Sequence, residues 1–210
     1  MKTKPVGIFE NTQLGVILKS KFGVILSNWL FQGMRFMNRY EIMIKILLDT
    51  ILLLIILQFI ELTILNFLFS VLLAHTINWV VNGHFFVLMR YVRPFPKRES
   101  DFEIFIEKFK SIAMKFECVD SVAIYGSYCR QCLNENSDLD VRVVVKKGIV
   151  AGFCGALFCM FSRFRALLST FPLDVFCCVE DAGLEKLRDD EIPVILFDRS
   201  GFVTDFYNKK

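Results

Sequence analysis

A long hydrophobic stretch dominates the first half of the chain. From Ile46 to Met89 there is no lysine or arginine, and most residues are apolar. As one helix this stretch would measure about 66 Å, roughly twice the hydrocarbon thickness of a bilayer. We therefore expect a membrane helical hairpin within residues 41–89, with spans at 43–60 and 62–82 and a turn near 58–63. The alternative is a single span at 62–82 preceded by an interfacial helix.

Basic residues flank this stretch on both sides, from Lys19 to Lys45 before it and from Arg90 to Arg98 after it. Positive charge marks the cytoplasmic side of a membrane, so we expect the protein in the cell membrane with both flanks cytoplasmic. Residues 1–40 combine basic and apolar positions, which fits a segment lying on an anionic membrane surface or a poorly ordered tail. Residues 90–100 form a basic, proline-containing linker.

Polar residues interrupt the second expected span at helical spacing. His75, Asn78, Trp79 and Asn82 share one helical face. Because polar groups are costly in a membrane, they indicate either interhelical contacts, with Asp49 of the first span or with a second protomer, or a site for a lipid headgroup. The sequence slightly favours helix–helix contacts, within the chain or in a homo-oligomer, over a lipid-headgroup site.

Residues 101–210 show a mixed pattern of helical and strand periodicities, which predicts an α/β domain. A helix is expected from Ser100 to about Glu117, where Ser100 and Glu103 resemble a capping box. The other predicted elements follow in chain order: strands at 122–125 and 141–145, a buried crossover helix within 149–171, a strand at 172–176, a short polar helix at 181–190 and a strand at 193–197, before a polar tail.

The chemistry-bearing residues lie around the first two strands. Gly126-Ser127 ends the first one, where a glycine allows close backbone approach and a following short helix would offer N–H groups to a phosphate. Asp138 and Asp140 begin the second strand two residues apart, so both carboxylates point to one face. Paired carboxylates of this kind favour a divalent cation.

Gly126-Ser127, ten further residues and then Asp138-Leu139-Asp140 resemble the signature of the polymerase-beta-like nucleotidyltransferases, especially their minimal form. The resemblance covers residues 100–205 and implies a small mixed sheet flanked by helices. It further implies that Asp174, in Pro172 to Phe176, is the third catalytic carboxylate.

The activity implied is transfer of a nucleoside monophosphate from an NTP to an acceptor hydroxyl. Asp138, Asp140 and Asp174 would hold two Mg²⁺ ions, whereas Gly126, Ser127 and Arg130 would bind the nucleotide. Because Asp174 must return beside the other two aspartates, we expect residues 149–161 to be a buried crossover helix rather than a membrane span, for which the run is also short.

One residue departs from the family pattern, because Gln131 stands where a glycine is usual. This leaves a second interpretation, a membrane-bound regulator that binds nucleotide without turning it over. The acceptor is not specified by the sequence, and membrane tethering favours a lipid, a lipid-linked sugar or a membrane protein.

Composition adds two limits. The net charge of +3 and the lack of a basic and aromatic pattern give no clear signal for nucleic-acid binding. The seven cysteines are expected to be reduced thiols, and Cys129 with Cys132 lacks the second ligand pair of a zinc site.

Overall fold

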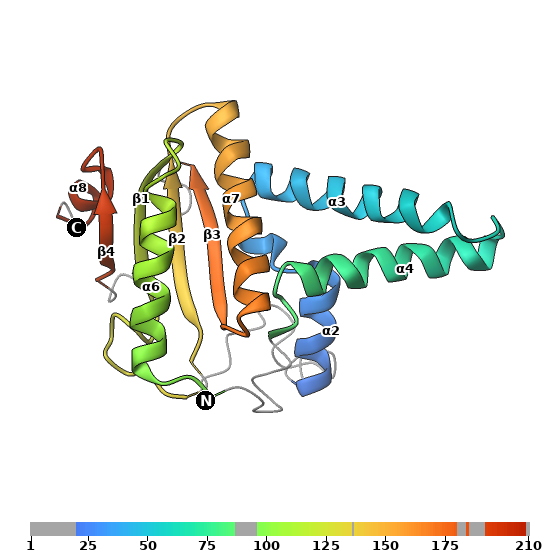
Figure 1. The fold of residues 1–210 in the computed structure, drawn as a ribbon, viewed down its shortest axis with the longest axis horizontal. Coiled ribbons are helices and arrows are strands. Elements are labelled where there is room, and N and C mark those ends of the chain that lie inside the picture. Colours follow the sequence, from blue (N-terminus) through green and yellow to red (C-terminus); the bar gives the residue numbers. More distant parts are fainter. Residues whose placement is uncertain (1–19, 87–95, 136, 180–183, 185–191, 209–210) are drawn as a thin grey trace, which may run out of the picture.

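The computed structural model describes residues 20–86, 96–135, 137–179, 184 and 192–208. It is a mixed α/β structure in which a four-stranded sheet carries helices on its faces, and a helical hairpin projects away from the sheet (Figure 1). The prediction of an α/β domain with a small mixed sheet after a helical hairpin is confirmed at this level.

The sheet has the strand order β3-β2-β1-β4. Strand β1 pairs antiparallel with β2 and with β4, whereas β2 and β3 are parallel. The predicted strands are all present, and their observed bounds are β1 Val119–Tyr125, β2 Leu139–Val145, β3 Leu173–Val179 and β4 Val194–Asp198.

Alternation along the strands divides the sheet into two faces. In β2, Leu139, Val141 and Val143 belong to the main core with α6 (Glu99–Ala113) and α7 (Ile149–Leu168). Side chains at alternate positions point to opposite faces. The intervening residues of β2 therefore face away from α6 and α7.

Helix α7 joins the parallel strands β2 and β3, as predicted for the crossover helix. Gly152 and Gly155 let it pack closely, because a Cβ at these positions would overlap the Tyr40 ring and the Val145 side chain. Among the described helices, α4 and α7 are long and apolar enough to cross a membrane. The buried packing of α7 against the sheet confirms its prediction as a core helix.

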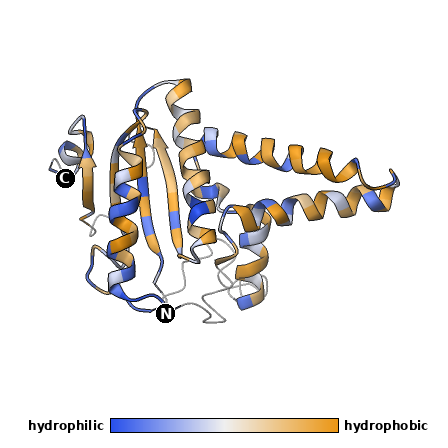
Figure 2. Cartoon of the chain, viewed as in Figure 1, coloured by the Kyte–Doolittle hydropathy of each residue, from blue (hydrophilic) through white to orange (hydrophobic). Residues whose placement is uncertain are grey.

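The predicted hairpin consists of α3 (Arg39–Leu57) and α4 (Ile64–Val81), which run side by side and reverse over residues 58–63. Both helices are apolar over most of their length (Figure 2). Helix α3 carries its charged residues within its first eleven positions: Arg39, Glu41, Lys45 and Asp49. Of the two predicted spans, the second is therefore the one long and apolar enough by itself.

The polar face of α4 makes contacts within the same chain. His75 Nδ1 lies 3.2 Å from Asp49 Oδ2, and Asn78 Nδ2 donates to Asp49 Oδ1 at 2.8 Å. Asn78 Nδ2 also lies 3.0 Å from the Lys45 carbonyl oxygen, and Asn82 donates to the Asn78 side chain. The predicted pairing of this face with Asp49 is confirmed.

Helix α2 (Lys21–Phe31) lies beside the base of α4 and is followed by a 3₁₀ helix, Met34–Phe36. Trp29 Nε1 donates to Thr76 Oγ1 at 3.2 Å, and Trp79 Nε1 donates to Asn28 Oδ1 at 2.8 Å. Helix α2 also exposes apolar residues, including Phe22, at 69% exposure. Within the N-terminal segment 1–40, residues 21–31 therefore form a helix that contacts α4. Residues 1–19 lie outside the described residues.

Several local predictions are corrected. Helix α6 begins at Glu99, where Asp101 rather than Glu103 accepts the capping hydrogen bond, from the Arg98 N–H at 2.9 Å. The expected polar tail contains helix α8 (Phe202–Asn208), which buries Val203 against the second face of the sheet. The polar helix expected at 181–190 falls almost wholly outside the described residues.

The cysteines also differ from expectation. Cys118 and Cys154 form a disulfide with a Cα–Cα distance of 6.4 Å, so the prediction of thiols is wrong for this pair. Cys129, Cys132, Cys159, Cys177 and Cys178 are thiols. The disulfide connects the residue before β1 to the first turns of α7, two segments that already share the main core.

Candidate active site

The three predicted catalytic aspartates lie at or just before the N-terminal ends of β2 and β3. Asp140 and Asp174 are direct partners in the parallel pairing of β2 and β3. Both alternate with core residues, so they point to the face opposite α6 and α7. Asp138 precedes Asp140 by two residues, just before β2 begins. The fold thus brings Asp140 and Asp174, which are far apart in the sequence, side by side on neighbouring strands.

Gly126 directly follows β1 and lies against Asp140. Tyr125, the last residue of β1, pairs with Asp140. Gly126 has a φ of +73°, and a Cβ added there would overlap Asp140 Oδ2. Glycine is therefore required twice, because a side chain would be strained by the left-handed backbone and would displace the carboxylate.

The segment after Gly126 is a set of consecutive turns, so the predicted short helix is wrong. The Cys132 N–H donates to the Ser127 carbonyl at 3.0 Å, and the Gln131 N–H donates to Tyr128 at 3.1 Å. These bonds close the loop without the row of parallel N–H groups that a helix N-terminus would present.

Ser127 nevertheless leaves a polar atom for a ligand. Its Oγ is buried and has no hydrogen-bond partner among the described residues. A buried hydroxyl without a partner is costly, and binding of an acceptor atom would remove that cost. Ser127 therefore provides a hydroxyl donor beside Gly126, in the loop where the sequence predicted nucleotide binding.

Gln131 occupies the left-handed region, with a φ of +52°. This is the position at which the family resemblance predicts glycine, and the backbone shows why: a glycine adopts this conformation without a Cβ penalty. Arg130, the residue before it, is exposed on the same loop. The departure from the family pattern thus coincides with backbone strain.

Arg142 is a candidate site residue that the sequence interpretation missed. It follows Asp140 by two residues, so it shares the face of the aspartates. Its guanidinium carbon lies 4.7 Å from the ring centre of Phe176, its pairing partner on β3. The alternation of Asp138, Asp140 and Arg142 was visible in the sequence and would have identified this cation.

The free edge of β3 is covered by side chains from two helices. Glu41 Oε2 accepts from the Cys177 N–H at 3.0 Å, and Asn38 Nδ2 donates to the Cys177 carbonyl at 2.8 Å. From α7, Arg163 Nε donates to the Val175 carbonyl at 3.0 Å. These contacts satisfy backbone groups that an edge strand otherwise exposes, and they hold the strand that carries Asp174.

Arg163 also adds charge near the site. Burial by itself lowers the pKa of Arg163, but the Glu41 carboxylate and, more weakly, Asp174 raise it above its ordinary value. The guanidinium therefore stays charged despite its burial. The Arg163 guanidinium carbon lies 5.4 Å from the ring centre of Phe176.

Two tyrosines, Tyr125 and Tyr207, lie on the face of the sheet that carries the aspartates. The Tyr125 hydroxyl lies 3.3 Å from the Tyr207 hydroxyl of α8. Burial raises the pKa of Tyr125, and the Tyr207 hydrogen bond raises it further, so the phenol stays protonated. Because Tyr125 pairs with Asp140, α8 lies over the part of the face that adjoins the aspartates.

The chemistry of the donor set fits Mg²⁺, which prefers carboxylate oxygens and is held by one or two carboxylates together with water and substrate phosphates. Asp140 and Asp174 on neighbouring strands supply such a pair. In the described ranges, no three histidine, cysteine, aspartate or glutamate side chains are gathered closely enough to hold a metal by themselves.

Comparison of the chain with protein-family models, curated proteins and solved structures gives no match. The resemblance to nucleotidyltransferases therefore remains a prediction carried by the residues quoted for it. In the structure, Gly126 lies against Asp140, and Asp140 pairs with Asp174 on the neighbouring strand of the mixed sheet.

Proposed function

We propose that this chain is a membrane-tethered nucleotidyltransferase that transfers a nucleoside monophosphate from an NTP to an acceptor hydroxyl. One observation carries the proposal: the glycine turn after β1 lies against Asp140, which is the direct strand partner of Asp174. This combines a close backbone approach with carboxylates on adjacent strands, as phosphoryl-transfer chemistry requires.

In this proposal Asp138, Asp140 and Asp174 hold two Mg²⁺ ions. When bound, the ions neutralise charge on the phosphate oxygens and polarise the phosphorus. Gly126 leaves room for a phosphate to approach the backbone, and the Ser127 hydroxyl donates a hydrogen bond to it. Asp174 accepts the proton of the acceptor hydroxyl as that oxygen attacks the α-phosphorus and pyrophosphate leaves.

Two arginines supply positive charge for the nucleotide. Arg130 projects from the loop after β1, and Arg142 lies on the carboxylate face of β2. Neutralising phosphate charge stabilises the transferring group through charge-assisted hydrogen bonds. Arg142 is held above Phe176, so its guanidinium is oriented before substrate binds.

The membrane tether is the helical hairpin. The part of the hairpin farthest from the sheet exposes large apolar side chains, among them Phe59 at 82%, Ile64 at 84% and Leu65 at 76%. Contiguous apolar surface of this kind is disfavoured in water and favoured in lipid. We propose that the hairpin is embedded in the cell membrane and that the basic flanks hold the sheet domain on the cytoplasmic side.

A tethered enzyme meets acceptors at the membrane. The proposed acceptor is a lipid, a lipid-linked sugar or a membrane protein with a free hydroxyl. Homo-oligomer formation is compatible with this arrangement, although His75 and Asn78 have their contacts with Asp49 inside one chain.

The second candidate function is a membrane-bound regulator that binds nucleotide without turnover. Two features of the loop favour it: Gln131 is strained where the family has glycine, and consecutive turns replace the expected helix. The turns align fewer backbone donors for a triphosphate than a helix N-terminus would.

The two candidates differ in the effect of Asp→Asn substitutions. We expect Asp138→Asn and Asp140→Asn to lower turnover by about a thousandfold or more, because preorganised metal charge supplies several kcal/mol of transition-state stabilisation. Asp174→Asn should abolish chemistry while keeping most Mg·NTP binding. The exposed Asp205→Asn on α8 makes the same chemical change away from the site and serves as the control.

The measurements are calorimetric Mg·NTP binding and pyrophosphate release, made on the full chain in the presence of membrane lipid. Pyrophosphate release that depends on Asp138, Asp140 and Asp174 but not on Asp205 supports the enzyme. Binding without pyrophosphate release, with Asp→Asn changing affinity alone, supports the regulator instead.

The membrane topology has its own test. In right-side-out vesicles, with Cys132→Ser to remove an exposed thiol, an impermeant reagent should label Glu61→Cys at the hairpin turn. It should not label Ser100→Cys at the start of α6. Labelling of Ser100→Cys from outside would contradict the cytoplasmic placement of the domain.

A further inference from the structure

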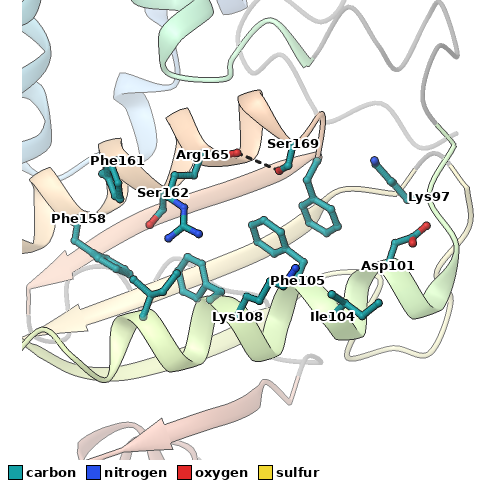
Figure 3. A pocket seen from close by; sticks show the side chains of 13 residues that line it. Lys97, Asp101, Ile104, Phe105, Lys108, Phe158, Phe161, Ser162, Arg165 and Ser169 are labelled. Atoms are coloured by element: carbon teal, nitrogen blue, oxygen red, sulfur yellow. Dashed lines mark hydrogen bonds between the residues drawn. The ribbon is translucent and has the colours of Figure 1, made fainter.

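A hollow lies on the other side of the sheet from the aspartates, between α6 and α7 (Figure 3). Its volume of about 350 Å³ is within the range of small-molecule sites, roughly 300–1,000 Å³. The floor is mainly aromatic, with Phe105, Phe109, Phe158 and Phe171 among its residues. Phe105 stacks on Phe171 with ring centres 3.9 Å apart. We call this hollow the α6/α7 groove.

The rim of the α6/α7 groove carries an excess of positive charge. Lys97, Lys108 and Arg165 line it, together with a single acid, Asp101. The Asp101 carboxylate is already engaged, because it accepts from the Arg98 N–H at 2.9 Å and lies 3.8 Å from Arg98 Nε. Three cations and one acid thus surround the aromatic floor. The charge of the acid, Asp101, is compensated by Arg98 at the start of α6.

Most acids of helix α6 lie away from the groove. Its other acids, Glu99, Glu103 and Glu107, recur every four residues and do not line the groove. They lie toward Tyr128, whose pKa is raised by burial and by these three carboxylates. The positive rim of the groove is therefore not neutralised by the acidic residues of the same helix.

The groove adjoins an exposed apolar surface of α7. Leu157, Phe161, Phe164 and Leu168 follow one another at spacings of three and four residues and are 37–71% exposed. Phe161 belongs both to this stripe and to the groove. Four residues before this stripe, Phe153 of α7 packs on Tyr40 at the base of the hairpin, with ring centres 5.1 Å apart. The groove thus opens beside apolar surface near the proposed membrane tether.

We propose that the α6/α7 groove is a binding site for an anionic amphiphile, a lipid-like molecule with one hydrocarbon chain and a phosphate head. The chain would lie on the phenylalanine floor, and the phosphate would pair with Lys97, Lys108 and Arg165. Charge complementarity carries this assignment, since an aromatic floor accepts any apolar group but a cationic rim selects an anion. The site is on the face opposite the aspartates, and it does not depend on the proposed transferase activity.

The test uses the full chain in nanodiscs of phosphatidylcholine, with dodecyl phosphate that carries a photoreactive diazirine near the chain end. After illumination, the labelled peptides are identified by mass spectrometry. We expect label on α6 and α7, displaced by unlabelled dodecyl phosphate but not by dodecanol, inorganic phosphate or ATP. These three competitors separate the amphiphile from a purely apolar ligand, a free anion and a nucleotide.

Charge reversal supplies the matched comparison. Lys108→Glu and Arg165→Glu should each raise the probe concentration needed for half-maximal labelling by about tenfold, as expected for the loss of one charge-assisted contact. Lys110→Glu makes the same change on α6 at a position that does not line the groove, and it should have no effect. Asp140→Asn should also leave labelling unchanged, which separates this site from the proposed active site.

Four outcomes would overturn the proposal. Equal weakening by Lys110→Glu and Lys108→Glu would show attraction to general surface charge. Displacement by dodecanol would remove the role of the anionic head, and displacement by ATP would reassign the groove to nucleotide. Label confined to peptides outside α6 and α7 would place the amphiphile elsewhere.

Discussion

Gly126 and Asp140 are in such close contact that the space of a Cβ on Gly126 is occupied by Asp140 Oδ2. Gly126 directly follows β1, and Asp140 is the second residue of the neighbouring strand β2. The absence of one side chain therefore determines where a carboxylate of the candidate site lies.

Gly126→Ala tests this relationship. The new Cβ must displace the Asp140 carboxylate, and the φ of +73° adds backbone strain. We expect a loss of at least about tenfold in Mg·NTP affinity or turnover, since small misplacement of positioned groups is costly. Gly201→Ala is the control, because Gly201 has a similar φ of +75° and nothing within 4 Å of an added Cβ. Equal effects of both variants on nucleotide would mean that backbone strain alone is responsible.

Gln131→Gly should stabilise the protein. Gln131 holds a left-handed backbone with a φ of +52°, and glycine removes the Cβ penalty of about 1 kcal/mol. Gln131→Ala removes the same polar atoms but keeps the Cβ, so the difference in unfolding free energy between the two variants isolates the backbone effect. Denaturant unfolding of the detergent-solubilised chain provides the measurement, and equal stabilities of the two variants would refute a strained turn.

Glu41→Gln should destabilise the contact between hairpin and sheet. Arg163 Nη2 lies 2.6 Å from Glu41 Oε1, with side chains 3% and 1% exposed. Removing one charge of such a pair leaves the other buried without compensation, which costs about 3–5 kcal/mol. Glu61→Gln, at the exposed hairpin turn, should change little. Thermal unfolding in detergent compares the two variants, and a neutral Glu41→Gln would show that the pair does not hold the hairpin to the sheet.

Stability should fall in acid through Asp198. Burial by itself raises the pKa of Asp198, but hydrogen bonds from Ser121 and Thr204 outweigh burial and lower the pKa below its ordinary value. A carboxyl whose pKa is lowered by folding stabilises the folded state above its unfolded pKa, about 3.9, and loses this contribution as the pH falls through its folded value.

Asp198→Asn should therefore lower stability at neutral pH and flatten the loss of stability below about pH 4. The free energy of unfolding, measured as a function of pH, reports both effects. Asp205→Asn on α8 is the matched control, since Asp205 is exposed. If Asp198→Asn loses as much stability below about pH 4 as the unmodified protein, other carboxyl groups cause the acid sensitivity.

The sequence by itself determined the elements that depend on local periodicity. The hairpin, with its turn at 58–63, follows from a hydrophobic stretch too long for one helix, and the strands around Gly126 and Asp140 follow from short apolar runs. The contact between Asp49 and His75 was also expected, because polar groups on apolar helices have few other partners. Spacing along the chain indicates Asp138 and Asp140, and Asp174 follows only from the family resemblance; the sheet places Asp140 beside Asp174.

Only the tertiary structure decided which side chains from distant segments meet. The pairing of Glu41 with Arg163 joins residues whose neighbours in sequence give no sign of a shared position. The replacement of the expected helix after Gly126 by turns, and the packing of α8 on the sheet, depend on contacts with other strands. The α6/α7 groove arises for the same reason. Local periodicity assigns a residue to a face, but the free energy that fixes its partner comes from packing between elements.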